Sequence, residues 1–413
     1  MVNEIPGFEL GYVSREPRGR ATPRDFSRDS AQMVHRFHRR LPGYRATRLV
    51  RLRQLARSWG VGEILVKDES TRFNLKAFKV LGSSYAMARL LCQKLERPLD
   101  NTDFDFLVST TARRIVGEMT FTTATDGNHG RGVAWMARQL DQQAVVYMPK
   151  GTVPSRVDNI RSHGAVVEVT DLNYDDTVRL AGDMARSKGW HLIQDTAWEG
   201  YTDIPLWIMQ GYMTMCTEAV EQMFAEGVRP THVFVQAGVG SLAAAVVGHL
   251  SNAFSDRLPQ FIIMEPKNAA CFLASAAAGD GRPRTVSGDL DTIMAGLACG
   301  EPNPMAWDIL WEFSNAYIRC DNYVSANGIR ILANPLAGDE AIESGESGSI
   351  GIGLLELIAS HPAFNCLKKD LGIGPDANLL FFNTEGATDP NNVRQILWHG
   401  KYRLLKNKEL NDG

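Results

Sequence analysis

A lysine with apolar neighbours is the first residue that could do chemistry. Lys79 stands in the run Ala77-Phe78-Lys79-Val80-Leu81. Burial lowers the pKa of a lysine, and the neutral amine is the form that condenses with an aldehyde. A lysine is most often a solvated surface charge, however, and Lys76 has flanks that are no more polar. The pattern therefore predicts a nucleophilic lysine in this segment without choosing between Lys76 and Lys79.

A polar turn forms the second cluster. It reads Thr122-Thr123-Ala124-Thr125-Asp126-Gly127-Asn128-His129-Gly130-Arg131-Gly132 and runs into the helical residues 133–137. A strand, a small polar turn and a helix start leave backbone N–H groups free, which is the geometry of an anion site. The alternative is that Asp126 or Asn128 is only a helix N-cap. That alternative explains one polar residue but not the density of small and polar residues.

A glycine turn of the same kind forms the third cluster. It reads Gln236-Ala237-Gly238-Val239-Gly240-Ser241 between an apolar run and a helical segment. Strand, glycine turn and helix place backbone amides around a phosphate. The spacing is neither GxGxxG nor a P-loop with GK[ST], so nucleotide binding is not indicated. One such turn is weak evidence, but its combination with the other two clusters is not.

Alternating strands and helices are expected to position these clusters. Short β-branched or apolar runs predict strands at 145–148, 165–169, 191–193, 232–236 and 261–264, and helical periodicity lies between them at 155–163, 174–188, 204–227 and 242–254. This alternation predicts an α/β fold with two open, mainly parallel, twisted sheets flanked by helices. No linker separates the domains, so we expect them to interleave: residues 1–87 and 196–413 as the large domain, and 88–195 as the small one.

Composition and charge exclude several other classes. The 413 residues are 44% hydrophobic and 22% charged, with a formal net charge of −3, so no basic field points to nucleic acid. The longest apolar run, 237–250, is shorter than the roughly 20 residues that cross a bilayer. The first ten residues lack a basic n-region, so no signal peptide is expected. The six scattered cysteines favour reduced thiols in the cytoplasm, with a Cys271–Cys299 bridge as the open alternative.

Together the three clusters resemble a known family. A Phe-Lys pair, a Gly-Asn-His turn and a later glycine-rich loop are typical of the fold-type II pyridoxal-phosphate enzymes. Within that group, the segments AFKVLGSSYA, TATDGNHGRGVAW, QDTAWEGY, QAGVGS and NTEGATD are similar to those of the diaminopropionate ammonia-lyases. The resemblance extends from about residue 41 to residue 389, and the acid before Gly-Asn-His is its most specific element. It implies pyridoxal 5′-phosphate as the cofactor, held between the two domains.

The resemblance also implies a role for each matching residue. Lys79 matches the lysine that binds the cofactor covalently, so the resemblance assigns this role to Lys79 and not to Lys76. The cofactor-binding set is expected to be Phe78, Lys79, Asn128 at the ring oxygen, Gly238, Val239, Gly240 and Ser241 at the phosphate, and Thr384 at the pyridine nitrogen. The catalytic residues are expected to be Lys79, Asp126 and Asp195. Substrate binding is assigned to Thr125, Asp126, Gly127 and His129, and no metal is expected.

The implied reaction is a β-elimination. A β-amino group leaves 2,3-diaminopropionate, of D or L configuration, and pyruvate and two molecules of ammonia result. We expect Asp126 to be the base, Asp195 to support it, and the proximity of the two carboxylates to raise one pKa. A hydroxy-amino-acid dehydratase or a β-replacement synthase of the same fold is the alternative. We also expect a homodimer, since that is usual in the family.

Three positions depart from the family pattern. Arg48 stands where a proline is usual, and Asn74 and Lys76 stand where glycine and asparagine are usual. We expect these residues to lie beside the site rather than in it. They bear on the identity of the substrate and on the rate, not on the cofactor.

Overall fold

Two sheets organise the chain. The computed structural model describes residues 1–19 and 23–404. Its larger sheet has eight strands in the order β1-β2-β11-β10-β9-β12-β4-β3, and its smaller sheet has four in the order β7-β6-β5-β8. The strands of the larger sheet are β1 (Asn3–Ile5), β2 (Leu10–Ser14), β3 (Arg48–Arg51), β4 (Glu63–Asp68), β9 (His232–Gln236), β10 (Gln260–Pro266), β11 (Ser314–Cys320) and β12 (Asn378–Asn383). Those of the smaller sheet are β5 (Thr120–Ala124), β6 (Gln143–Met148), β7 (Val166–Val169) and β8 (His191–Leu192).

The predicted fold class is confirmed. All pairings in the smaller sheet are parallel, and so are the central pairings from β11 to β4 in the larger one. The antiparallel strands β1, β2 and β3 at the two edges of the larger sheet were not predicted. Their short sequences carry no clear alternation, so only pairing with the finished sheet defines them.

The helices cover both faces of the larger sheet. Along β9, Val233 and Val235 belong to one apolar core while Phe234 belongs to another, because successive side chains point to opposite faces. Helices α3, α9 and α10 contribute to the first core, and α13 and α14 to the second. The principal helices are α1 (Arg28–Arg39), α2 (Arg53–Trp59), α3 (Val80–Lys94), α6 (Asn128–Gln139), α7 (Pro154–Arg161), α8 (Tyr174–Lys188), α9 (Asp203–Ala225), α10 (Ser241–Ala253), α11 (Cys271–Ala278), α12 (Pro304–Phe313), α13 (Asn322–Ala333), α14 (Glu346–Ser360), α15 (Asn365–Asp370) and α16 (Pro390–His399).

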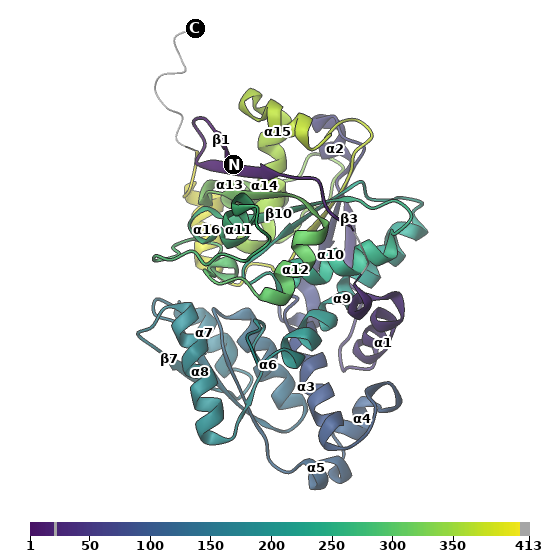
Figure 1. Ribbon diagram of the computed structural model, residues 1–413, viewed down its shortest axis with the longest axis vertical. Helices are drawn as coiled ribbons and strands as arrows, with labels where there is room; N and C mark the ends of the chain where they lie inside the picture. The colour runs from purple at the N-terminus through teal and green to yellow at the C-terminus, as the bar shows by residue number, and fades with distance from the viewer. Residues whose placement is uncertain (20–22, 405–413) are drawn as a thin grey trace.

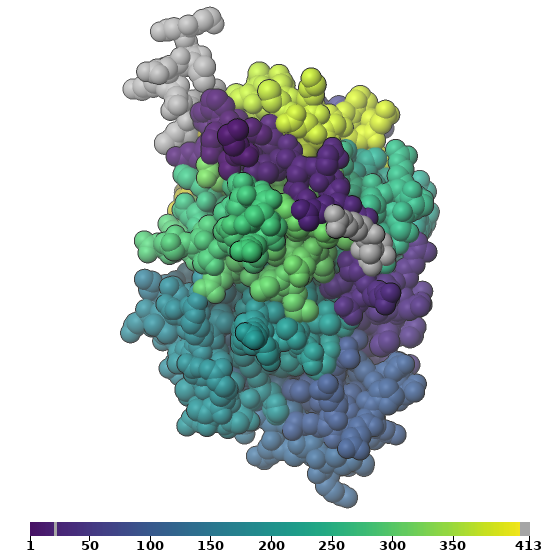
Figure 2. Space-filling model, in the orientation of Figure 1, coloured from purple at the N-terminus to yellow at the C-terminus, as the bar shows by residue number. Residues whose placement is uncertain are grey.

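The smaller sheet and its helices form the lower half of the molecule in Figure 1, with α6, α7 and α8 around it. Its strands all come from residues 120–192, while the larger sheet takes strands from both sides of that range. In Figure 2 the N-terminal residues (purple) lie over the upper half, near C-terminal residues (yellow). The division into 1–87 with 196–413 and 88–195 is compatible with this arrangement and stays a proposal.

The cysteines are free, and five of the six are buried. The Cys271–Cys299 bridge left open by the sequence is not formed in this structure.

Across residues 1–19 and 23–404, no single helix combines the length and apolar character needed to cross a membrane. One bent pair, Glu346–Ser360 with Pro362–Asp370, meets that test by length and composition alone.

Glu265 provides a test of the packing of the larger sheet. This fully buried carboxyl accepts the N–H groups of Phe272 and Leu273, and burial raises its pKa to about 8. Because the folded-state pKa is higher than the unfolded one, its contribution to stability is complete below about pH 4.5 and is lost as the pH rises through 8. We therefore expect Glu265→Gln to lose less stability than the parent protein between pH 6 and pH 9. Thermal unfolding at both values checks this, and identical pH dependence of the two proteins would contradict it.

Candidate active site

An irregular segment leads from strand β4 to Lys79. After β4 ends, Phe73, Asn74 and Lys76 all take left-handed backbone angles, with φ of 48°, 58° and 57°. Such angles favour glycine and asparagine, so Lys76 is unusual at its position. The carbonyl of Lys76 accepts from Gly386 N–H, and Phe78 N–H donates to the Thr384 carbonyl. These bonds tie the segment to the end of β12.

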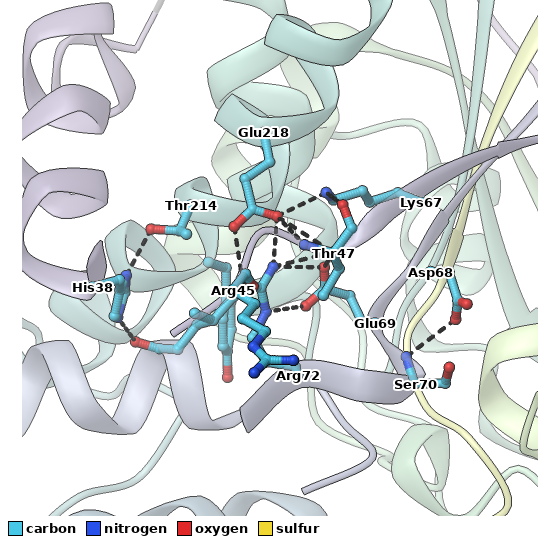
Figure 3. A network of polar contacts seen from close by, with 12 residues as sticks. His38, Arg45, Thr47, Lys67, Asp68, Glu69, Ser70, Arg72, Thr214 and Glu218 are labelled. Atoms are coloured by element: carbon cyan, nitrogen blue, oxygen red, sulfur yellow. Dashed lines mark hydrogen bonds and ion pairs between the residues drawn. The ribbon is translucent and has the colours of Figure 1, made fainter. Parts of the chain in front are cut away.

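A network of four buried charges anchors the same segment from the other side (Figure 3). Glu218 of α9 accepts from Lys67 Nζ at 2.7 Å and from Arg72 Nη2 at 2.7 Å, and Arg72 Nε donates to Glu69 at 2.8 Å. The side chains of all four residues are at most 1% exposed. Breaking one member of such a set strands a buried charge, so the network fixes the path of residues 67–72.

Lys79 lies directly before α3 and its ammonium meets Asp195. The Nζ–Oδ2 distance is 2.6 Å, and the side chains are 15% and 2% exposed. Burial alone would lower the pKa of Lys79, but the Asp195 carboxylate outweighs burial and raises that pKa. The expectation that apolar neighbours make this amine neutral is therefore wrong. The decisive partner is a carboxylate 116 positions away in the sequence.

The three departures from the family pattern lie outside the cavity that Lys79 lines. Lys76 Nζ binds Glu343 at 2.7 Å and is 45% exposed. Arg48 is half-exposed and pairs with Asp68 and Glu340. Asn74 is exposed in the left-handed segment described above.

Asp126 also lines the cavity, and a partly buried arginine accompanies it. Arg156 Nη1 lies 3.7 Å from Asp126 Oδ2 and donates to the Asp126 carbonyl at 3.3 Å. The expected raising of a pKa by neighbouring aspartates is not found at Asp195: although burial would raise the pKa of that carboxyl, the Lys79 ammonium lowers it to about 2. The paired cation, not the second carboxylate, controls its charge.

The N-cap alternative for Asp126 and Asn128 is wrong. Thr125 Oγ1 accepts the N–H groups of Gly127 and Gly130 at 2.9 and 3.0 Å, so Thr125 satisfies the turn. Gly127 stands at the cap position with φ of 151°. The carboxylate of Asp126 and the amide of Asn128 are thus available to the cavity, which both residues line.

The other residues assigned to the substrate are placed differently. His129 is buried, and its Nε2 lies 2.7 Å from the Ile193 carbonyl. Burial lowers the pKa of His129, so the ring is neutral. Neither Thr125, Gly127 nor His129 lines the cavity. Their direct contact with substrate stays a prediction, and their visible contacts are within the turn.

The glycine loop leaves its amides free. In the part of the chain that the structure describes, no backbone carbonyl accepts from the N–H groups of Gly238, Val239 or Gly240, which precede helix α10. Ser241 Oγ donates to the Asp195 carbonyl at 2.5 Å and accepts from Asn303 Nδ2 at 2.9 Å. The hydroxyl of Ser241 is therefore engaged within the protein, and its backbone N–H is the group left to bind an anion.

Thr384 closes the cavity at the end of β12. Its Oγ1 accepts from Gln236 Nε2 at 3.0 Å. Several further residues that line the cavity were not predicted as site residues: Tyr174, Tyr212, Gln236, Leu242, Gly296, Leu297, Cys299, Ser347 and Glu385. Gln236 and Glu385 stand inside motifs noted in the sequence, whereas Tyr212 lies within the long helix α9, where no local pattern distinguishes it from a core residue.

A larger cavity of about 700 Å³ adjoins this one and shares Tyr174 and Val239 with it. Four carboxylates and two guanidinium groups line it: Asp175, Asp183, Glu199, Glu301, Arg179 and Arg186. Burial, and then the charge of Glu301, raises the pKa of Asp175 to about 6. Despite its size this cavity contains none of the predicted catalytic residues, so we regard it as the approach to the smaller one.

Comparison with known proteins identifies the chain's relatives. Residues 40–359 match the family model described as pyridoxal-phosphate dependent enzyme. The chain is 50% identical over 380 residues to the diaminopropionate ammonia-lyase of Escherichia coli (strain K12), covering 92% of this chain and 94% of that protein. It is 47% identical over 367 residues to the enzyme of that name from Salmonella typhimurium (strain LT2), covering 88% of this chain and 91% of that protein.

A solved structure agrees with these matches. The crystal structure of the E. coli diaminopropionate ammonia-lyase, in complex with an aminoacrylate–pyridoxal-phosphate azomethine intermediate, superposes with a TM-score of 0.89 at 46% identity, covering 96% of this chain and 99% of that one. The chain belongs to the family of pyridoxal-phosphate dependent enzymes. Within this family it is a relative of the diaminopropionate ammonia-lyases over nearly its whole length.

The residues present fit pyridoxal phosphate. Free amides at Gly238–Gly240 suit a phosphate, and the Lys79 amine suits an aldehyde. Among the described residues, the buried Tyr212 hydroxyl and Ser347 Oγ have no hydrogen-bond partner, and both residues line the cavity. Unpaired buried polar groups are costly in a folded protein, so their presence here indicates a polar ligand.

Gly240 gives a test of the phosphate loop. Its φ is +94°, and an added Cβ would lie 2.3 Å from Phe272 Cζ. We expect Gly240→Val to displace the loop and lower the affinity for pyridoxal phosphate about 10-fold or more. Gly279→Val is the matched control, because Gly279 has φ of +73° but nothing within 4 Å of an added Cβ. The control should lose stability and keep its affinity, and an unchanged affinity in Gly240→Val would contradict the loop assignment.

Proposed function

We propose that this protein is a pyridoxal-phosphate-dependent ammonia-lyase that eliminates the β-amino group of 2,3-diaminopropionate. The observation that carries the proposal is one cavity that holds Lys79 paired with Asp195, Asp126 beside Arg156, and the free amides of the glycine loop. The relatives described above bear the same activity in their names. The products are pyruvate and two molecules of ammonia.

Lys79 and Asp195 act as a proton-holding pair. When bound, pyridoxal phosphate supplies a ring that withdraws electrons from the substrate's α-carbon. Asp195 Oδ2 accepts from Lys79 Nζ at 2.6 Å and stabilises the protonated form of that amine. When Lys79 Nζ is not attached to the cofactor, it could accept a proton from the α-carbon or return one to the departing nitrogen. Asp195, whose pKa the Lys79 ammonium lowers to about 2, lies 2.6 Å from Lys79 Nζ and keeps that amine in position.

Asp126 acts as a second base. Its carboxylate lines the same cavity but belongs to the turn before α6, whereas Lys79 belongs to the start of α3. Two bases on separate elements allow a proton to be removed from either face of the substrate. We infer that Asp126 removes the α-proton from one enantiomer of the substrate and that Lys79 removes it from the other.

The approach cavity favours a cationic substrate. Its four carboxylates exceed its two guanidinium groups, so its field attracts positive charge. A diamino acid carries one more ammonium group than serine or threonine at neutral pH. Burial and the charge of Glu301 raise the pKa of the Asp175 carboxyl to about 6, and a neighbouring ammonium would stabilise its charged form. This is a physical reason for the enzyme to prefer diaminopropionate to hydroxy amino acids.

An assay of pyruvate release with four substrates tests the proposal. D- and L-diaminopropionate, serine and threonine are compared at equal concentrations with the cofactor-saturated protein. We expect kcat/KM for at least one enantiomer of diaminopropionate to exceed that for serine by about 100-fold or more, because binding groups for the second ammonium discriminate strongly. Faster turnover of serine or threonine would favour the hydroxy-amino-acid dehydratase alternative instead.

We also propose a homodimer in the cytoplasm, from the family resemblance and from the free thiols respectively. Light scattering during size-exclusion chromatography checks the first of these, and fractionation of the source cells checks the second.

A further inference from the structure

Glu385 is a buried carboxylate in the cavity that the proposed mechanism does not use. It follows Thr384, is 3% exposed, and accepts hydrogen bonds from three residues, two of which lie on distant segments. Asn128 Nδ2 donates to its Oε2 at 2.5 Å, Ser347 N–H donates to its Oε1 at 3.0 Å, and Thr388 Oγ1 donates to its Oε2 at 3.2 Å. The contact with Asn128 joins residues 257 positions apart.

The backbone of Glu385 reaches the lysine segment at the same time. Glu385 forms an isolated β-bridge with Ala77, two residues before Lys79. The carbonyl of its neighbour Thr384 accepts from Phe78 N–H, and the N–H of its neighbour Gly386 donates to the Lys76 carbonyl. Glu385 is therefore in contact both with the segment that presents Lys79 and with the turn that presents Asn128.

An ionised carboxylate can only accept hydrogen bonds, so it determines which end of the Asn128 amide faces it. The amide nitrogen must point to Glu385. One of its two hydrogens is then fixed on the carboxylate, and the second remains free to donate. A charged acceptor also polarises the amide, which makes that second hydrogen a better donor.

We infer that Glu385 is a positioning residue that aims the Asn128 N–H at the ring oxygen of bound pyridoxal phosphate. This rests on the proposed function, in which Asn128 bonds that oxygen. Without the carboxylate the amide is free to turn its oxygen toward the ring, where two acceptors would repel each other. Glu346 and Arg156 also interact with Glu385 through space. Neither one replaces its contact with Asn128.

The test uses Glu385→Gln, which keeps the size of the side chain and removes its charge. Two properties of the cofactor-loaded protein are measured: the visible absorbance of the bound cofactor and the affinity of the apoprotein for pyridoxal phosphate. A donor at the ring oxygen stabilises negative charge there, so its loss should move absorbance from the visible to the near-ultraviolet band. We expect the affinity to fall about 10-fold, as for a lost hydrogen bond to a charged group.

Thr388→Val is the matched control. It removes another donor to the same carboxylate oxygen but leaves Asn128 in contact, so spectrum and affinity should match those of the parent protein. Glu385→Gln is also combined with Asn128→Ala. If Glu385 acts through Asn128, the double variant has the same spectrum and affinity as Asn128→Ala alone. Additive effects of the two changes would overturn the inference, and so would an unchanged spectrum in Glu385→Gln.

A second variant and the spectrum of the parent protein separate a failure of this inference from a failure of the proposed function. If Glu385→Gln does not fold, as judged by circular dichroism, Glu385→Asp replaces it: this variant keeps the charge but shortens the reach to Asn128, and it should shift the spectrum in the same direction. A parent protein without any cofactor band would contradict the proposed function itself. A normal parent spectrum with no shift in either Glu385 variant would contradict only the inference about Glu385.

Discussion

Lys79→Ala is expected to abolish the visible cofactor band of the purified protein and to lower the rate of elimination by about 10⁴-fold or more. The change removes the amine that attaches the cofactor and moves protons, and loss of such a group has effects of this size. Absorbance spectra and pyruvate release measure the two losses. Lys76→Ala is the control, because Lys76 is 45% exposed and pairs with Glu343 outside the cavity. Loss of the band in Lys76→Ala instead would contradict the assignment.

The same variant should also be less stable, for a reason that the structure makes specific. Without Lys79, the carboxylate of Asp195 stays buried at 2% exposure and loses its cation. Stranding a buried charge costs several kcal/mol, on the order of 3–5. Adding Asp195→Asn to Lys79→Ala removes that charge, so the double variant should recover thermal stability but no activity. No recovery would mean that the ion pair is not what holds this part of the site together.

Asp126→Asn is expected to affect the two enantiomers of diaminopropionate unequally. If Asp126 and Lys79 serve opposite faces, the variant loses turnover of one enantiomer, which we expect to be the D form, by about 10²–10⁴-fold. The L form, deprotonated by Lys79, should lose less. Because Thr125 and not Asp126 satisfies the N–H groups of the turn, any loss of thermal stability should come from the weakened pair with Arg156 and affect both enantiomers alike.

Initial rates with each pure enantiomer provide the measurement for Asp126→Asn. Asp175→Asn is a useful comparison, since Asp175 lines the approach cavity rather than the catalytic one. That variant should raise KM for both enantiomers alike. Equal slowing of D- and L-diaminopropionate in Asp126→Asn would show that the two-base account is wrong.

The sequence predicted those parts of the molecule that local patterns determine. Runs such as Val233–Val235 are apolar on both faces, so a parallel strand beneath two helical layers follows directly. The glycine loop and the turn before α6 were found because small residues cluster where backbone amides must be exposed. The short edge strands β1, β2 and β3 lack such patterns, and only their pairing in the sheet defines them.

The site's electrostatics could not be predicted in the same way. Neighbours in the chain suggested a neutral Lys79, but its pKa depends on Asp195, which only the fold brings within 2.6 Å. The contact between Asn128 and Glu385 likewise spans 257 positions. Tyr212 reaches the cavity from the interior of α9, where an aromatic residue looks like ordinary core. These properties depend on contacts between residues that are far apart in the sequence, so no single segment predicts them.

The stoichiometry of the products tests the central claim most directly. The cofactor-saturated protein is incubated with a known amount of D- or L-diaminopropionate until the reaction is complete, and pyruvate and ammonia are both measured. Elimination of the β-amino group, followed by hydrolysis of the remaining one, predicts one pyruvate and two ammonia for each substrate molecule consumed. Consumption of diaminopropionate without pyruvate, or with only one ammonia, would contradict the account.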